Sequence, residues 1–164
     1  MAQPYLPAED VRAMAKTIRT NESIVIDCPV AEVFAYFTDP ENVPDWGTSI
    51  DEYKMVSGSP EEVGSLASVT TKVAGVRLQA TEEVTAYEKN KRIGFESRKT
   101  RIGYERELDF DTDGDGATRV TYRLDAEGGT GLFKFGDTIV QKLYARDVRG
   151  NLENAKTILE SSNG

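Results

Sequence analysis

The middle of the chain alternates between hydrophobic and polar residues, a pattern typical of β-strands that bury one face. The expected strands are 16–27, 49–56, 66–73, 76–87, 91–98, 104–111 and 117–127. The alternation is weakest in 49–56, and the first strand is marked instead by consecutive β-branched residues, Ile24, Val25 and Ile26. From residue 49 onward the connections are short, so we expect successive strands to pair antiparallel.

Two short helices are predicted between the first two strands. Pro29 suits the first turn of a helix. Apolar residues then recur every three or four positions, as on the buried side of an amphipathic helix: Val30, Val33, Phe34 and Phe37. Asp39 and Pro40 supply the cap and first residue of a second helix. We expect that helix to end near Pro44, with Trp46 following it.

A long amphipathic helix is predicted at the end of the chain. Its apolar residues are spaced by three, four or five: Leu132, Phe135, Ile139, Leu143, Val148, Leu152, Ala155 and Leu159. A helix of about 30 residues would be roughly 45 Å long. No other element could cover one face of the sheet, so we predict a single α+β domain over 15–162. Residues 1–14 are expected to form a tail or a short capping helix.

The composition excludes several classes of protein. Asp and Glu number 28 against 20 Lys and Arg, and the net charge of -8 disfavours nucleic acids and anionic membranes as partners. Neither a secretory signal nor an apolar stretch of membrane-spanning length is visible, so we expect a cytoplasmic protein without stable membrane insertion. We expect a monomer or homodimer.

The residues needed for common metal and nucleophile sites are scarce. The chain has no histidine and a single cysteine, Cys28, which excludes His-based sites and an intrachain disulfide. We expect Cys28 to be a small buried residue, the alternative being a thiol activated at a helix N-terminus. The acidic run 109–116 lacks the twelfth-position acid of an EF-hand, and its Asp-Gly pairs predict a hairpin turn. No metal or cofactor is therefore expected.

The run IDCPVAEVFAYFTDPENVPDW, residues 26–46, resembles the opening of the START/polyketide cyclase (SRPBCC, helix-grip) superfamily. In that superfamily a strand leads into a helix begun by proline and then a D-P-x-x-x-P-x-W turn. The tail from Gly131 to Ser161 resembles the superfamily's C-terminal helix, and the resemblance spans about 16–161. It implies a curved, seven-stranded antiparallel sheet gripping the long helix, with a cavity between them.

The resemblance also implies a range of functions. Members bind or transport lipids, sterols, polyketides and other apolar molecules, and a minority cyclise or dehydrate polyketides. Their catalytic residues differ between subfamilies, so no catalytic position carries over. Only Trp46 and the apolar strand and helix positions match, as scaffold or pocket lining.

Two charged residues interrupt strand faces that are otherwise mainly apolar. Glu82 shares its face with Leu78, Ala80, Val84 and Ala86, and Arg106 shares one with Tyr104, Leu108 and Phe110. With the strand order of the superfamily, one strand separates them and their backbones lie about 10 Å apart. A buried charge without a partner is costly, so we expect them to pair, be hydrated or meet a ligand. The alternatives are a polar anchor in an apolar pocket, a structural ion pair, or a bulge that turns one residue outward.

The residues expected to line a ligand site are Phe34, Phe37, Trp46, Leu78, Glu82, Phe95, Tyr104, Arg106, Leu108, Tyr122, Phe133, Ile139 and Leu143. Most of the aromatic residues equally fit an ordinary core. Tyr104 and Tyr122 differ because a buried hydroxyl needs a hydrogen-bond partner.

Three functions are consistent with this pattern. The first is binding of a small hydrophobic or amphipathic ligand (a lipid, polyketide or aromatic metabolite) between sheet and helix. The second is a cofactor-independent polyketide cyclase or dehydratase, with Glu82 as base and Arg106 or Tyr104 stabilising an enolate. The third is a protein-interaction module, which requires an exposed apolar patch.

Overall fold

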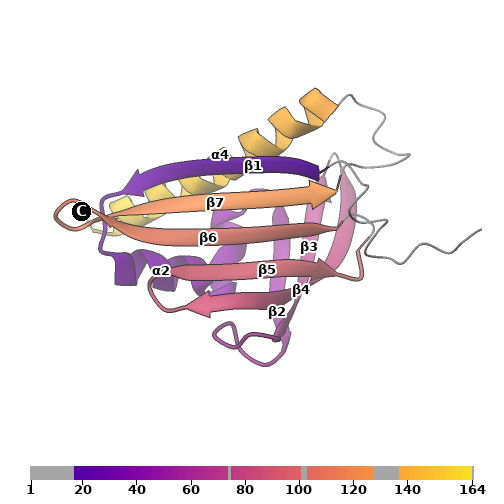
Figure 1. Ribbon diagram of the computed structural model, residues 1–164, viewed down its shortest axis with the longest axis horizontal. Helices are drawn as coiled ribbons and strands as arrows, with labels where there is room; N and C mark the ends of the chain where they lie inside the picture. The colour runs from indigo at the N-terminus through magenta and orange to yellow at the C-terminus, as the bar shows by residue number, and fades with distance from the viewer. Residues whose placement is uncertain (1–16, 74, 101–102, 128–136, 164) are drawn as a thin grey trace, which may run out of the picture.

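The computed structural model describes residues 17–73, 75–100, 103–127 and 137–163 (Figure 1). The strands are β1 (Thr17–Ile26), β2 (Ile50–Ser57), β3 (Leu66–Val73), β4 (Val76–Glu88), β5 (Arg92–Arg98), β6 (Tyr104–Asp113) and β7 (Ala117–Glu127). The helices are α2 (Val30–Thr38), the 3-10 turn η1 (Pro40–Asn42), α3 (Val43–Trp46) and α4 (Asp137–Ser162). The expected N-terminal tail, 1–14, lies outside the described residues.

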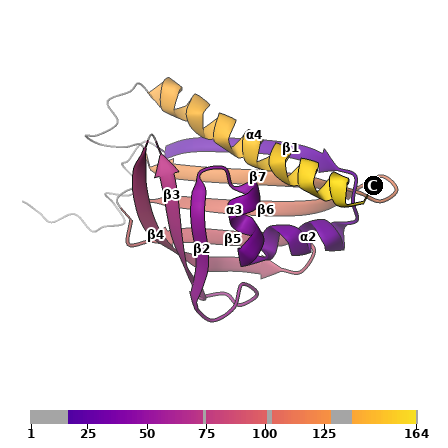
Figure 2. The same cartoon turned by 180° about the vertical axis from the view of Figure 1, so that it is seen from behind.

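The strands form a seven-stranded antiparallel sheet in the order β1-β7-β6-β5-β4-β3-β2. Strands β2 to β7 follow one another as a meander, and β1 adds to the outer edge of β7. All the described helices lie on one side of the sheet, with α4 packed along β1 (Figure 2). The predicted α+β helix-grip architecture is confirmed.

An aromatic core joins α2 and α3 to the sheet. As the spacing predicted, Val33, Phe34 and Phe37 form the buried side of α2. Phe34 meets Phe110 edge-on, with ring centroids 5.1 Å apart, and Phe37 lies 5.1 Å from Trp46. These contacts fill the end of the concave face nearest the β6–β7 turn.

The second short helix extends further than we expected. Asp39 caps η1 by accepting a hydrogen bond from the Glu41 N–H at 2.9 Å. The chain then continues directly into α3, whose last turn closes with the Gly47 N–H donating to Val43 O at 2.8 Å. Trp46 therefore ends this helix rather than following it, and its side chain is buried.

A β-bulge in β4 makes the predicted position of Ala86 wrong: we expected Ala86 on the same face as Glu82, and it lies on the opposite face. The pairing with β5 shifts by one residue before Ala86, so Ala86 pairs with Gly94 on the convex side of the sheet. Tyr87, rather than Ala86, reaches the inner face, where it packs 5.6 Å from the ring of Phe34. Gly94 permits the bulge, because a Cβ there would lie 3.1 Å from Thr85 Oγ1 and 3.2 Å from Ala86 Cβ. Alternation fails wherever a strand gains one residue over its partner.

The end of the acidic run, residues 114–116, forms the predicted turn between β6 and β7, and its first five residues belong to β6. Gly114 and Gly116 adopt φ values of 62° and 111°, which favour glycine. The described part of the C-terminal helix, α4, has 26 residues. The start of the longer helix that we predicted, near Leu132, lies outside the described residues.

Polar contacts fasten α4 to the rest of the fold. The buried side chain of Asn151 accepts a hydrogen bond from the Thr48 N–H at 2.9 Å and another from Thr48 Oγ1 at 3.1 Å. Asp147 accepts from Ser49 Oγ at 3.2 Å, and Lys156 Nζ donates to Val25 O at 2.6 Å. These contacts fix the helix against β1 and the α3–β2 connection.

Candidate functional site

A buried ion pair lies on the concave face of the sheet. Glu82 on β4 and Arg106 on β6 are only 2% and 6% exposed. Arg106 Nε donates to Glu82 Oε1 at 2.8 Å and Nη2 donates to Oε2 at 2.6 Å. The two strands flank β5, as the resemblance to the superfamily implied. Of the outcomes expected for these charges, the structure shows direct pairing.

Tyrosines from three strands surround this pair. The Tyr104 hydroxyl donates to Glu82 Oε1 at 2.8 Å. Tyr53 on β2 interacts with both Glu82 and Arg106, and Tyr122 on β7 interacts with Arg106. We call Tyr53, Glu82, Tyr104, Arg106 and Tyr122 the polar cluster.

Phe95 supports the cluster from β5. The carbon at the centre of the Arg106 guanidinium lies 4.0 Å from the centroid of the Phe95 ring. This cation–π contact is strengthened where water is excluded. It also holds the plane of the guanidinium so that its edge faces Glu82.

The protonation states follow from burial and from the pair itself. Burial, with the nearby Glu82 carboxylate, raises the pKa of Tyr53 and of Tyr104 above the ordinary value. Burial likewise raises the pKa of Tyr122. Burial alone would lower the pKa of Arg106, but the Glu82 carboxylate raises it well above its ordinary value. The cluster thus holds one cation and three protonated phenols at neutral pH.

Trp46 borders the cluster on the helix side. Its ring lies 6.5 Å from that of Tyr122, and only 1% of the residue is exposed. Within the part of the chain that the structure describes, its indole Nε1–H has no hydrogen-bond partner. A buried donor without an acceptor is uncommon and is one that a ligand oxygen can use.

The structure brings together one part of the predicted ligand-lining set. Glu82, Phe95, Tyr104, Arg106 and Tyr122 are contiguous, and Leu108 is buried on the same face of β6. Trp46 joins this group to the aromatic core.

The other predicted lining residues lie elsewhere. Phe34 and Phe37 pack in the aromatic core, away from the ion pair. Leu78 is only half-buried near the start of β4, and Leu143 is 57% exposed on α4. Phe133 and the side chain of Ile139 lie outside the described residues.

Sequence reasoning missed Tyr53. The alternation in its strand is weak, and Tyr53 shares a face with Asp51 and Met55, which gives no clear apolar stripe. The only indication in the sequence was that Tyr53 lies two residues before the apolar Met55 and therefore on the same face of the strand. The position of β2 in the sheet decides that this side chain reaches the ion pair.

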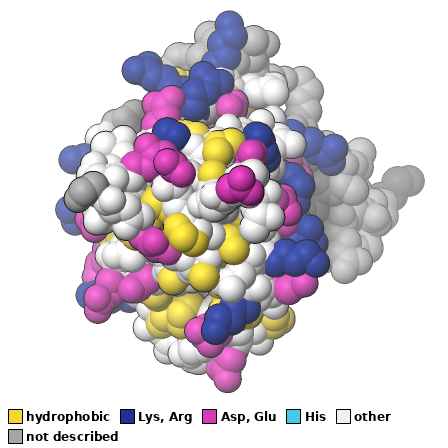
Figure 3. Space-filling view, turned by 90° about the vertical axis from the view of Figure 1, so that its left-hand side faces the viewer, with side chains coloured by type: hydrophobic (Ala, Val, Ile, Leu, Met, Phe, Trp, Pro, Cys, Tyr) yellow, Lys and Arg dark blue, Asp and Glu magenta, His cyan; other side chains and the backbone are white. Residues whose placement is uncertain are grey.

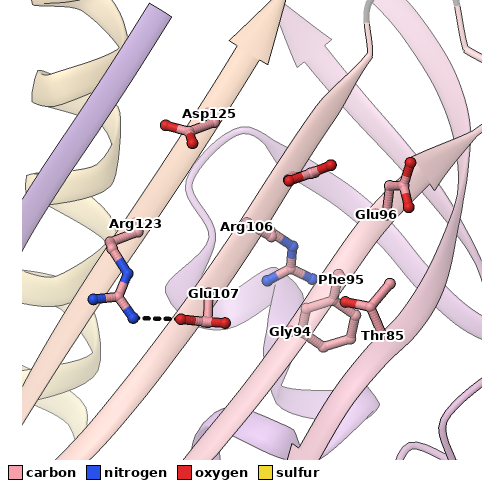
Figure 4. A pocket seen from close by; sticks show the side chains of 9 residues that line it. Thr85, Gly94, Phe95, Glu96, Arg106, Glu107, Arg123 and Asp125 are labelled. Atoms are coloured by element: carbon pink, nitrogen blue, oxygen red, sulfur yellow. Dashed lines mark hydrogen bonds and ion pairs between the residues drawn. The ribbon is translucent and has the colours of Figure 1, made fainter. Parts of the chain in front are cut away.

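Two surface hollows accompany the cluster. One, of about 300 Å³, opens on the convex face over the backbone of Arg106 and is lined mainly by charged side chains, with Arg123 paired to Glu107 (Figure 4). The other, of about 600 Å³, lies between η1 and β2 and includes Tyr53. Tyr53 lines this second hollow and is also a member of the polar cluster, so the hollow adjoins the cluster.

Several alternative sites receive no support. Burial raises the pKa of the Cys28 thiol, which is 1% exposed, so this thiol is not activated. Across the described residues, no group of three or more His, Cys, Asp or Glu side chains is placed to hold a metal ion. Nor does any described helix combine the length and apolarity needed to span a membrane.

Exposed apolar residues are dispersed over the described surface. The large ones lie on β2, on the β2–β3 connection, on β4 and at two separate positions of α4: Val56, Val63, Val76, Leu143 and Ile158. Figure 3 shows one face of the molecule, on which hydrophobic side chains are interspersed with acidic and basic ones. This distribution does not favour a protein-interaction module.

A curved antiparallel sheet gripping one long helix, with a buried polar cluster on its concave face, defines a START-like helix-grip protein. Residues 17–160 match the family described as polyketide cyclase/dehydrase and lipid transport, and the chain belongs to this family. A search of curated protein sequences finds no match.

Solved structures show the same fold. A Thermus thermophilus protein aligns over 89% of this chain and 99% of its own, with 19% identity and a TM-score of 0.76. A START superfamily protein from Mycobacterium smegmatis covers 87% and 97%, with 15% identity and a TM-score of 0.74. The Zhui aromatase/cyclase of a Streptomyces species covers 88% and 94%, with 12% identity and a TM-score of 0.73.

Proposed function

We propose that this protein binds a small amphipathic molecule on the concave face of its sheet. The apolar body of the ligand lies between sheet and helix, and its polar group lies at the polar cluster. One observation carries the proposal: a charged pair and two tyrosines, Tyr53 and Tyr122, are buried, with Tyr104 partly buried beside them, on a face that is otherwise mainly apolar. Ligand sites are commonly built from such a few polar groups on an apolar lining.

Stability alone does not account for the Glu82–Arg106 pair. Replacing a buried ion pair by hydrophobic residues of similar volume is often neutral or stabilising by about 1–4 kcal/mol. The aromatic core shows that this chain fills other parts of the same face with apolar side chains. A function in recognition supplies a reason for charges at this position.

The apolar face can supply the affinity. A ligand that buries about 300 Å² of apolar surface gains roughly 7 kcal/mol before the costs of association. The polar cluster then fixes the orientation of the ligand rather than providing most of the binding energy.

Native mass spectrometry of the freshly purified protein, followed by denaturing extraction, tests the proposal. We expect a co-purified small molecule that is apolar over most of its surface. Replacing Arg106 by Leu should remove it, while Arg98→Leu, on the convex side of β5, should retain it. A protein that carries no molecule and binds neither lipids nor aromatic compounds in a thermal-shift screen would contradict the proposal.

A cyclase or dehydratase reaction is the second candidate. It is favoured by the phenol of Tyr104, a protonated donor held against a carboxylate in a buried site. Glu82 Oε1 already accepts from two donors and Oε2 from one. A substrate would therefore have to displace a donor before Glu82 could take a proton. Turnover of an aromatic polyketide that is lost in Glu82→Gln, with binding retained, would establish this activity.

A further inference from the structure

We propose that the polar cluster selects a neutral oxygen-bearing group, such as a hydroxyl, phenol or ketone, and rejects a carboxylate. This inference rests on the proposed function and specifies the chemistry of its ligand. The observation behind it is the juxtaposition of one buried cation, Arg106, with one buried anion, Glu82, in two-point contact.

The charge of the cluster is already balanced. Arg106 directs two of its N–H groups to Glu82, and the remaining members are tyrosines. The acidic residue that acts on the cluster from α4 is Asp147, which adds negative potential at Tyr122. A ligand carboxylate would therefore be a further buried anion without a free cation to meet it.

The available hydrogen-bonding groups suit an uncharged acceptor. The Tyr122 oxygen accepts from Arg106, which leaves its O–H able to donate, and the Trp46 Nε1–H is a buried donor with no acceptor among the described residues. A hydroxyl or carbonyl oxygen can accept from these groups without changing the net charge. Because water is excluded, an added unit charge is penalised far more strongly here than at the surface.

Matched pairs of ligands test this selection. We would measure the affinities of naphthol against naphthoic acid, and of dodecanol against dodecanoic acid, by isothermal titration calorimetry at neutral pH. Each pair keeps one apolar body and changes only the polar group. We expect the alcohol of at least one pair to bind about tenfold or more tightly than its acid, equivalent to about 1.4 kcal/mol.

The pH dependence of the wild-type protein gives a second readout. If only the uncharged acid binds, its affinity falls by about tenfold for each pH unit above the carboxyl pKa of roughly 4–5. The affinity of the alcohol should stay level between about pH 5 and 8, because Arg106 stays charged and the tyrosines stay protonated.

A variant should invert the selection. Glu82→Gln removes the anion and leaves the Arg106 cation free, so we expect the acid to bind more tightly than the alcohol. Glu83→Gln is the control: Glu83 pairs with Arg98 at 2.9 Å on the opposite face of β4, and its loss should leave the preference unchanged. Should Glu82→Gln fail to fold, the wild-type pH profile still decides.

The outcomes separate the two proposals. If the wild-type protein binds the acid as tightly as the alcohol in both pairs across this pH range, neutral selection is wrong and ligand binding stands. If neither member of either pair binds, the proposed function fails and the inference fails with it.

Discussion

The guanidinium of Arg106 lies 4.0 Å above the ring of Phe95, on the strand next to its own. In this position it is held from one side by an aromatic face and at its edge by the Glu82 carboxylate. The residue is therefore fixed before any ligand arrives. Such preorganisation limits the entropy that a ligand must offset on binding.

Removing one partner of the Glu82–Arg106 pair should destabilise the protein more than replacing both partners by apolar residues. Arg106→Leu leaves the Glu82 carboxylate buried without its cation, and we expect the free energy of unfolding to fall by about 3–5 kcal/mol. The double variant Glu82→Met, Arg106→Met should recover most of that loss, because no buried charge remains. Urea denaturation measures both values. Equal destabilisation of the single and double variants would show that the pair is itself a major source of stability.

The buried tyrosines should make stability fall at alkaline pH. Burial raises the pKa values of Tyr53 and Tyr104 in the folded state, so above pH 10 the unfolded chain releases protons that the folded chain keeps. Stability is then present below about pH 10 and falls by up to about 1.4 kcal/mol per pH unit for each tyrosine.

Unfolding midpoints in urea between pH 8 and 11 measure this loss. Tyr104→Phe should flatten the decline. Phenolate absorbance of the folded wild-type protein should show these tyrosines untitrated until the fold opens. A decline as steep in Tyr104→Phe as in wild type would exclude this residue as a source.

Two glycine substitutions should change stability in opposite directions. In Gly94→Ala the new methyl lies 3.2 Å from Ala86 Cβ, which cannot rotate away, so we expect a loss of about 1–2 kcal/mol. A Cβ added at Gly150 in α4 would meet no atom within 4 Å, so Gly150→Ala should raise the free energy of unfolding by roughly 0.5–1 kcal/mol through helix propensity alone. Thermal denaturation of both variants checks the signs, and a neutral Gly94→Ala would show that the bulge can shift.

The attachment of α4 to the α3–β2 connection should depend on the side-chain amide of Asn151. Asn151→Ala leaves the Thr48 N–H without its acceptor, and we expect a loss of about 1–3 kcal/mol. Asn154, half-buried three residues further along α4, provides the control, and Asn154→Ala should fall within about 0.5 kcal/mol of wild type. Hydrogen exchange of the Thr48 amide gives a local readout. Unchanged protection in Asn151→Ala would contradict this role.

The sequence predicts the sheet well because alternation is a local property of each strand. The same alternation, combined with the strand order that the resemblance implies, brings Glu82 and Arg106 within reach of each other, while direct pairing remains one of several expected outcomes. It fails at Ala86, because the bulge depends on the missing side chain of Gly94, a residue on the neighbouring strand. It also misses Tyr53, whose role depends on how β2 lies across the sheet rather than on its own strand pattern.

The aromatic contacts from Phe37 through Trp46 to Tyr122 give the protein a built-in optical probe. Trp46 is the only tryptophan in the chain, and its ring lies next to a member of the polar cluster. Its fluorescence therefore comes from one known place, where α3 meets the concave face. A shift in its emission on titration would report events beside Arg106 without any added label.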